Sequence, residues 1–342
     1  MSKHEKWIDD VLPKHKRITE SVVTILENLL KSQGIEYLSV SGRTKNKQSA
    51  LEKIIRKSYK SPNIEMTDLS GIRIIVFFES DIVKVSEIIK KSFTVDNQNS
   101  RNQDEKLPVN QTGYRSVHFV CDLGKARTEL PEFEGLSGLK FEIQVRTVLQ
   151  HAWAELAHDR NYKFSGNLPP SIERNLYLYA GMLEIADKGF SDLSKQIDEY
   201  INTVHQKNIK GEFSYNLDDL SLQEFVESWA TNNNINLQQL KVKTNLNELL
   251  NELKQYGIVT ATQLNEIIPK NYAEVCKKTN FETTILGTVR RWMIINDWKK
   301  FISHVSFDWV LSRDIDFFTH FIPSEELDDF KGSFEWDDTP HL

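Results

Sequence analysis

The stretch from Glu142 to Lys163 constrains the fold most, because its residue pattern changes from that of a strand to that of a helix. Up to Arg146, apolar and polar residues alternate, which is typical of a strand with one buried and one polar face. Further along, ionisable residues recur every three or four positions, which predicts a helix that carries His151, Glu155, His158 and Tyr162 on one side. A strand with a carboxylate that leads directly into such a helix predicts a polar cleft.

A metal site on this helix is the first alternative to weigh. Glu155 and His158 have the Glu-x-x-His spacing of di-iron carboxylate bundles, but those bundles need a second such pair, which the chain lacks. The His-Glu-x-x-His pattern of zinc peptidases is absent as well. His158 and Asp159 together supply too few ligands for a metal phosphohydrolase. The sequence therefore argues against a metal site formed by this helix alone.

Length and composition indicate a globular protein with more than one domain. The 342 residues are enough for two domains, and 39% hydrophobic and 27% charged residues suit a folded, water-exposed chain. No apolar run approaches the roughly 20 residues of a membrane span, and the N-terminus lacks the apolar core of a signal peptide. The two cysteines, Cys121 and Cys276, lie far apart and suit a reducing compartment. We expect a cytoplasmic protein without a membrane partner.

Charge divides the chain into two parts. Residues 1–210 hold 31 Lys and Arg against 28 Asp and Glu, a net charge of +3, whereas residues 211–342 hold 12 against 21, a net charge of −9. Such an asymmetry indicates two units with different partners.

The order of the expected elements predicts an α+β fold. The chain contains strands at residues 38–41, 71–78, 116–122 and 139–146. Helices are expected at residues 15–33, 49–60, 81–91, from 147 to before Pro169, and 171–205, with a polar loop at 97–112. We expect a mixed β-sheet flanked by helices over residues 1–207, a linker at 208–216, and an acidic, mainly helical accessory or regulatory domain at 217–342. Its helices are expected at 220–229, 246–256, 262–268, 272–278 and 284–301, followed by an aromatic-rich segment at 307–321.

Two clusters have the composition of a polyphosphate and metal site. The first holds several cations and a serine around the second expected helix: Arg43, Lys45, Ser49, Lys53 and Arg56. Residues three or four apart share a helix face, so Lys45, Ser49, Lys53 and Arg56 are expected together, although a solvated basic helix has the same pattern. The second is Asp68, near Gly71 and Arg73 at the start of the buried strand. A carboxylate there suits Mg²⁺, which keeps waters and needs only one or two carboxylates; the alternative is that Asp68 caps a short helix.

A third cluster reads Gly113-Tyr114-Arg115-Ser116-Val117-His118. The glycine permits a tight turn, and the aromatic ring beside it suits stacking on a base; the alternative is a loop glycine followed by a core tyrosine.

Taken together and in this order, these motifs closely resemble the synthetase domain of RelA/SpoT-type alarmone synthetases over about residues 20–205. The Gly-Tyr-Arg-Ser-x-His and Glu-x-Gln-x-Arg-Thr elements carry most of the resemblance. It implies a mixed sheet related to nucleotidyltransferases. It also implies transfer of the β,γ-pyrophosphate of ATP to the ribose 3′-hydroxyl of GDP or GTP, with release of AMP and with Mg²⁺ as cofactor.

The resemblance also implies roles for single residues. The catalytic group is Glu142, Gln144 and Arg146, in which Glu142 holds Mg²⁺ or takes the 3′-hydroxyl proton. The ATP-binding group is Arg43, Lys45, Ser49, Lys53, Arg56 and Arg73, with Arg43 and Arg73 flanking the adenine. The metal ligands are Asp68 and Glu142. The acceptor-binding group is Lys106, Tyr114, His118, His151 and Glu155, with Tyr114 stacked on the guanine. Such a set suits pyrophosphoryl transfer, which depends on charge neutralisation and positioning.

Several questions stay open at the level of sequence. Thr112 stands where many family members have Asn, so the identity of the acceptor is open. We expect a small, stand-alone synthetase of the stringent response without the hydrolase and ribosome-binding modules of long members. The alternatives are a toxic relative that pyrophosphorylates the tRNA 3′ end, as in toxin–antitoxin systems, and a non-catalytic nucleotide sensor. A homo-oligomer, and an intramolecular contact between the acidic C-terminal domain and the synthetase domain, are further expectations.

Overall fold

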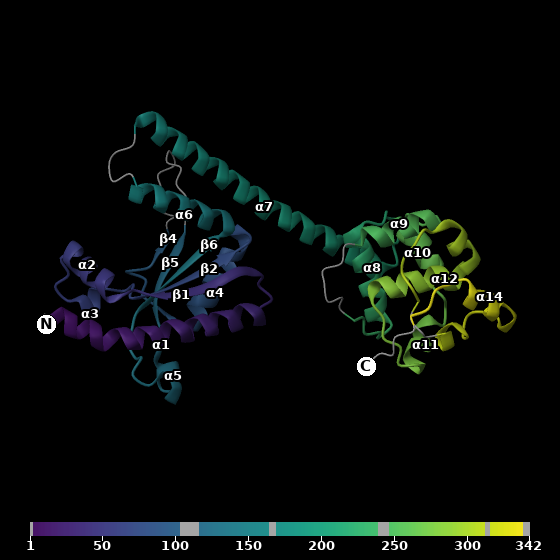
Figure 1. Ribbon diagram of the computed structural model, residues 1–342, viewed down its shortest axis with the longest axis horizontal. Helices are drawn as coiled ribbons and strands as arrows, with labels where there is room; N and C mark the ends of the chain where they lie inside the picture. The colour runs from purple at the N-terminus through teal and green to yellow at the C-terminus, as the bar shows by residue number, and fades with distance from the viewer. Residues whose placement is uncertain (1–2, 103–115, 164–168, 239–245, 312–314, 338–342) are drawn as a thin grey trace. The chain divides into compact units, whose positions relative to one another are not determined.

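The computed structural model describes residues 3–102, 116–163, 169–238, 246–311 and 315–337. The chain forms two compact units, Met1–Lys195 and Gln196–Leu342, which divide within one long helix (Figure 1). None of the helices in the described ranges combines the length and apolarity that a membrane span requires.

The first unit is built on a mixed β-sheet, as the sequence predicts. Its strands are β1 (Tyr37–Thr44), β2 (Ser70–Val76), β3 (Thr94–Val95), β4 (Arg101–Asn102), β5 (Val117–Asp122) and β6 (Phe141–Thr147). The strand order is β1-β2-β6-β5-β3, with β4 also paired to β5. Strands β2 and β6 run parallel, and the other pairs are antiparallel. The expected strands at 38–41, 71–78, 116–122 and 139–146 correspond to β1, β2, β5 and β6.

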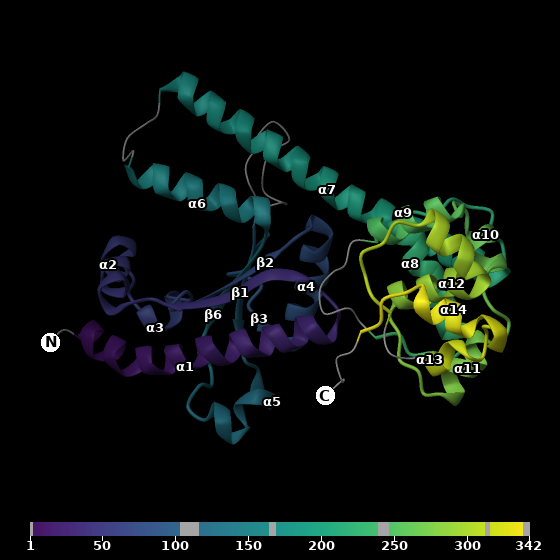
Figure 2. The same ribbon diagram turned by 45° about the vertical axis from the view of Figure 1, so that its right-hand side comes forward.

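The apolar face of the sheet is covered by α1 (Lys3–Ser32) and α4 (Glu79–Ser92). A stripe on α1 packs with alternate residues of β2 and β6 in one buried core; its members include Ile18, Val22, Leu26, Ile72, Ile74, Ile143 and Val145. Gly42 lets α1 lie close to β1, because a Cβ there would stand 2.6 Å from the Thr19 methyl carbon. In both ribbon views the sheet lies between α1 and α6 (Val148–Lys163) (Figures 1 and 2).

The first helix is longer than the sequence pattern predicts. It begins at Lys3, whereas we expected a start at residue 15, and it continues through Pro13. Proline costs a helix one backbone hydrogen bond. The helix persists because Ile8 and Val11 are buried against Ile54, Met66 and Leu69, which extends its apolar stripe toward the N-terminus.

The remaining helices of the first unit are short, apart from α7. They are α2 (Lys47–Lys57), α3 (Pro62–Glu65), α5 (Lys125–Thr128), a 3₁₀ turn at Pro131–Phe133 and the start of α7 (Pro170–Lys210). Helix α2 begins after Asn46, whose side chain accepts a hydrogen bond of 2.7 Å from the Ser49 amide. Lys45 therefore precedes the helix, and the prediction that it shares a helix face with Ser49 and Lys53 is wrong.

The second unit is helical, as predicted. It contains α8 (Asp219–Asn232), α9 (Asn247–Tyr256), α10 (Ala261–Glu266), α11 (Tyr272–Lys278), α12 (Ile285–His304), α13 (Ile315–Phe318), a 3₁₀ turn at Ser324–Glu326 and α14 (Leu327–Gly332). Its core is rich in aromatic side chains, among them Tyr272, Trp292, Phe301, Phe318 and Phe330.

The segment expected as a linker is anchored on this helical unit. The Ala261 amide donates to the Tyr215 carbonyl at 3.0 Å, and Thr262 Oγ1 donates to the Phe213 carbonyl at 2.9 Å. These bonds arise because Phe213 and Tyr215 pack against the core of the unit. The domain boundaries at 207 and 217 stay a prediction.

Candidate functional site

The polar face of the sheet gathers the functional side chains on adjacent strands. In β6, Phe141, Ile143 and Val145 are buried, whereas Glu142, Gln144 and Arg146 are partly exposed, which is the alternation read from the sequence. The register places Glu142 beside Gly71 and Gln144 beside Arg73. On the other side of β6, His118 pairs with Gln144. Side chains of β2, β6 and β5 therefore converge on one surface.

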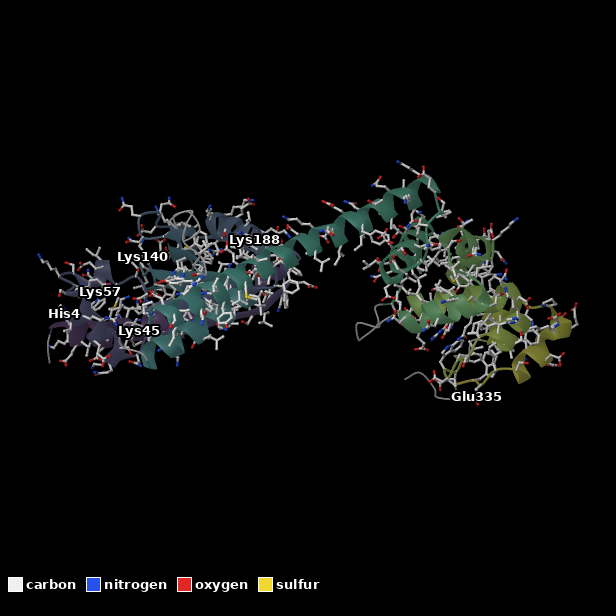
Figure 3. All side chains as sticks on the ribbon, turned by 90° about the horizontal axis from the view of Figure 1, so that it is seen from above. His4, Lys45, Lys57, Lys140, Lys188 and Glu335 are labelled. Carbon is white, nitrogen blue, oxygen red and sulfur yellow. The ribbon has the colours of Figure 1, made fainter. Side chains whose placement is uncertain are left out.

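A cleft of about 550 Å³ lies over this surface. Its lining comes from β1, the start of α2, the loop before β2, β2 itself, β6 and α6: Ser41, Gly42, Arg43, Lys45, Ser49, Asp68, Gly71, Ile72, Arg73, Glu142, Gln144 and Glu155. Most of the residues predicted to bind ATP, the metal and the reacting hydroxyl thus share one cleft. Lys45, labelled in Figure 3, follows directly after β1.

Asp68 is the centre of a cluster of cations. Lys53 Nζ lies 2.6 Å and Lys45 Nζ 3.3 Å from Asp68 Oδ2, and all three side chains are at most a quarter exposed. The second carboxylate oxygen, Oδ1, is buried and has no hydrogen-bond partner among the described residues. Asp68 does not cap the neighbouring helix α3, because the N-cap position of that helix is Ser61.

Glu142 is held by two hydrogen bonds to the same oxygen. His118 Nδ1 lies 2.8 Å and Gln144 Nε2 2.9 Å from Glu142 Oε1, and Arg146 in turn donates to Gln144 Oε1 at 3.0 Å. Burial acts to raise the pKa of Glu142, but the hydrogen bonds from His118 and Gln144 and the nearby charges outweigh it and leave that pKa below its ordinary value. Glu142 is therefore ionised at neutral pH.

The mouth of the cleft is crossed by an ion pair between β2 and α6. Arg73 Nη1 lies 2.8 Å from Glu155 Oε1, and His151 Nδ1 lies 3.7 Å from the same oxygen. Burial, followed by the charge of Arg73, lowers the pKa of His151, and burial also lowers the pKa of Arg146. His151 is therefore neutral at pH 7 in this arrangement.

Not every predicted residue joins the cleft. Arg56 is exposed on α2 and is not among the lining residues. Lys106 and Tyr114 lie outside the described residues, so their predicted contacts with the acceptor remain predictions. The side chains of His158 and Tyr162, which were expected on the same side of α6 as His151, also lie outside what the structure describes.

Three supporting contacts were not predicted from the sequence. Ser116 Oγ lies 2.7 Å from His118 Nε2 and thereby fixes the ring that contacts Glu142. Thr147 caps α6, because its Oγ1 accepts from the Gln150 amide at 3.1 Å and the Gln150 side chain accepts from the Thr147 amide at 3.1 Å. That Thr-x-x-Gln spacing is a capping box visible in the sequence. The buried Asp187 of α7, which accepts from Thr147 Oγ1 at 2.5 Å, carries no such signal.

The donor set fits a magnesium ion that is completed by substrate. In the described part of the chain, no group of three or more His, Cys, Asp or Glu could hold a metal by itself. Asp68 and Glu142 nevertheless line the same cleft, and Asp68 Oδ1 is a buried oxygen without a partner. Two carboxylates with phosphate and water oxygens are the usual surroundings of Mg²⁺.

Comparisons with known proteins show which family the chain resembles. A family model described as a region found in RelA/SpoT proteins matches residues 42–167. GTP pyrophosphokinase YjbM of Bacillus subtilis is 35% identical over 166 residues, which span 47% of this chain and 73% of YjbM. GTP pyrophosphokinase YwaC of the same organism is 29% identical over 160 residues, 46% of this chain and 73% of YwaC. The crystal structure of small alarmone synthetase 1 from Bacillus subtilis matches at 30% identity and a TM-score of 0.48, over 57% of this chain and 99% of that one.

Proposed function

The chain belongs to the RelA/SpoT family as a pyrophosphokinase of the small alarmone synthetase type, and we propose that it transfers the β,γ-pyrophosphate of ATP to the ribose 3′-hydroxyl of GDP or GTP. The observation that carries the proposal is a single cleft that is lined both by the cations Arg43, Lys45 and Arg73 and by the carboxylates of Asp68 and Glu142. In this reaction the 3′-oxygen attacks the β-phosphorus, the bond from that phosphorus to the α,β-bridging oxygen breaks, and AMP leaves.

The cations of the cleft bind the donor in this proposal. Arg43 and Lys45, which line the cleft, and Lys53, which contacts the lining residue Asp68, neutralise the triphosphate. Without them the charge of the triphosphate repels an incoming oxygen nucleophile. Arg73 has a planar guanidinium, which stacks on an adenine face as well as it pairs with a carboxylate. Its present partner, Glu155, has a side chain that is 57% exposed. Replacing this ion pair by stacking on adenine therefore costs little free energy.

Glu142 takes the proton of the 3′-hydroxyl in this proposal. Its Oε1 is occupied by His118 and Gln144, which orients the carboxylate and leaves Oε2 for the substrate. A lowered pKa keeps the group ionised before the reaction, and the same charge suits it as a metal ligand. Gln144 and Arg146 hold Glu142 in place and do not themselves need to touch the reacting atoms.

Asp68 and Glu142 are the residues that would hold Mg²⁺. When bound, Mg²⁺ neutralises phosphate charge and orients the phosphate oxygens. The orphaned Asp68 Oδ1 supports this assignment, because a buried carboxylate oxygen without a partner is costly unless a ligand completes it.

The experiment that tests the proposal offers the purified chain several acceptors. ATP labelled in its β- and γ-phosphates is incubated with Mg²⁺ and with GDP, GTP or deacylated tRNA in separate reactions. The proposal requires label on GDP or GTP and an equal amount of AMP. Label on tRNA alone assigns the chain to tRNA pyrophosphorylation. Label on none of the three acceptors refutes both the nucleotide and the tRNA versions of the transfer.

A further inference from the structure

The two lysines proposed to bind the triphosphate already share one carboxylate as an ion-pair partner. Lys53 and Lys45 both contact Asp68 through its Oδ2, at 2.6 Å and 3.3 Å. The charge of Lys53 also acts on Glu142, where it lowers the carboxyl pKa, so this ammonium group lies near both proposed metal ligands. One cation of the protein thus stands near the two carboxylates that suit a divalent cation.

We propose that Asp68 makes polyphosphate binding depend on a divalent cation. Asp68 keeps Lys45 and Lys53 in ion pairs until the divalent cation takes their place at its carboxylate. This inference rests on the proposed function, since it takes the same cleft as the ATP site. Without metal, a free polyphosphate must compete with Asp68 for the two ammonium groups and also meets the charge of Asp68 itself. With metal, the two lysines are released to the phosphates.

The geometry supports an exchange of partners. Both lysines bind the same oxygen, whereas Oδ1 of Asp68 is buried and has no hydrogen-bond partner in the described part of the chain. The carboxylate can therefore take a further cation through Oδ1 before its contacts with the lysines break. The three side chains are 20–24% exposed, and charges at this depth are screened less than they are at the surface. A small rotation of the lysines then moves them from Asp68 toward the cleft.

The consequence is selectivity for the metal complex of the nucleotide. An aspartate that served only as a metal ligand would affect metal-free binding only through the repulsion between its charge and the phosphates. An aspartate that also restrains the lysines weakens binding of the free polyphosphate. A neutral substitution at position 68 tightens metal-free binding in both cases, but only an aspartate that restrains the lysines makes the gain depend on them.

The test is calorimetric binding of ATP, and of inorganic tripolyphosphate, to the full chain in excess EDTA and without an acceptor. We expect Asp68→Asn to bind both ligands roughly tenfold more tightly than the wild type, because a repelling charge and a competitor for the lysines are both removed. With Mg²⁺ present, the same variant should bind ATP no more tightly than the wild type. Metal-free binding that is unchanged or weaker in Asp68→Asn overturns the proposal.

Three further variants sharpen the result. Asp9→Asn is the matched control, because Asp9 pairs with Lys47 at 2.7 Å outside the cleft, and it should leave metal-free binding unchanged. The gain from Asp68→Asn should be much smaller in a Lys53→Met background, measured against Lys53→Met alone, than it is in the wild type; an equal gain in both backgrounds contradicts the lysine mechanism. Asp68→Ser repeats the test should the Asn variant fold poorly. None of these binding measurements requires transfer activity. A failure of the proposed transfer reaction is therefore distinguishable from a failure of this inference about binding.

Discussion

Replacement of Glu142 by glutamine should remove the catalytic base and leave the folded structure intact. Glutamine keeps the shape of the side chain and an oxygen that accepts from His118 and Gln144, which lie 2.8 and 2.9 Å from the present carboxylate. Hydrogen bonds to a charged acceptor are worth about 1 kcal/mol more than those to a neutral one, so the two bonds together predict a loss of roughly 2 kcal/mol of stability at most. Removal of a positioned base instead costs about 10²- to 10⁴-fold in rate.

The assay measures AMP release and transfer of label to GDP or GTP, with the free energy of unfolding determined in parallel. Glu129→Gln is the control, since the Glu129 side chain is 66% exposed and pairs with Lys125 of its own helix region at 3.9 Å, and it should keep wild-type activity. A Glu142→Gln protein that folds and retains more than about a tenth of the wild-type rate refutes the assignment of Glu142 as the base.

Four further predictions concern other parts of the chain. Tyr114→Ala should raise the KM of the acceptor by the factor that corresponds to the roughly 1–3 kcal/mol of base stacking, and it should leave the affinity for ATP intact. If the affinities for acceptor and ATP, measured separately, fall equally, Tyr114 has only a structural role. Thr147→Val should destabilise the first unit by about 2–4 kcal/mol and increase amide exchange in α6, whereas Thr147→Ser should not, because only valine removes the cap and the donor to Asp187. Burial lowers the pKa of His15 from 6.5 to about 4, so as the pH falls the imidazole is protonated in the unfolded chain before it is protonated in the folded one. The free energy of unfolding should therefore fall by up to about 3 kcal/mol between pH 6.5 and pH 4, and denaturation of His15→Gln should not show this loss. Residues 1–210 alone should be more active and more toxic to growth than the full chain, if a tethered domain of net charge −9 restrains the synthetase at an effective concentration of order millimolar; a soluble but equally active fragment refutes this.

The sheet was predictable because its two kinds of strand have simple patterns. Strand β6 alternates, and its period of two assigns Ile143 to the core and Gln144 to the cleft. Strand β2 is almost continuously apolar, which predicts its place between two neighbours. The start of α1 was not predictable in the same way, because Pro13 signals an end to a helix, and only the burial of Ile8 in a tertiary cluster overrides that signal.

The candidate site was predictable as a set of residues but not as a set of contacts. The motifs named Asp68, Lys45 and Lys53, yet the sharing of one carboxylate oxygen by both lysines depends on how the loop before β2 meets α2. Asp187 lies 40 residues from its partner Thr147 and follows no motif, so only the packing of α7 reveals it. Arg56 has the spacing of the cluster but faces solvent. The sequence could not show this, because spacing along a helix does not tell which face is buried.

The central claim is that a pyrophosphoryl group moves as one unit from ATP to a guanosine 3′-hydroxyl. The most direct measurement supplies ATP labelled in both the β- and γ-phosphates together with GTP or 3′-deoxy-GTP, and follows both labels and AMP. The account predicts that GTP gains both labels in equal amounts, that one AMP appears for each product, and that 3′-deoxy-GTP gains none. Release of ADP with a singly labelled product, or labelling of 3′-deoxy-GTP, would contradict it.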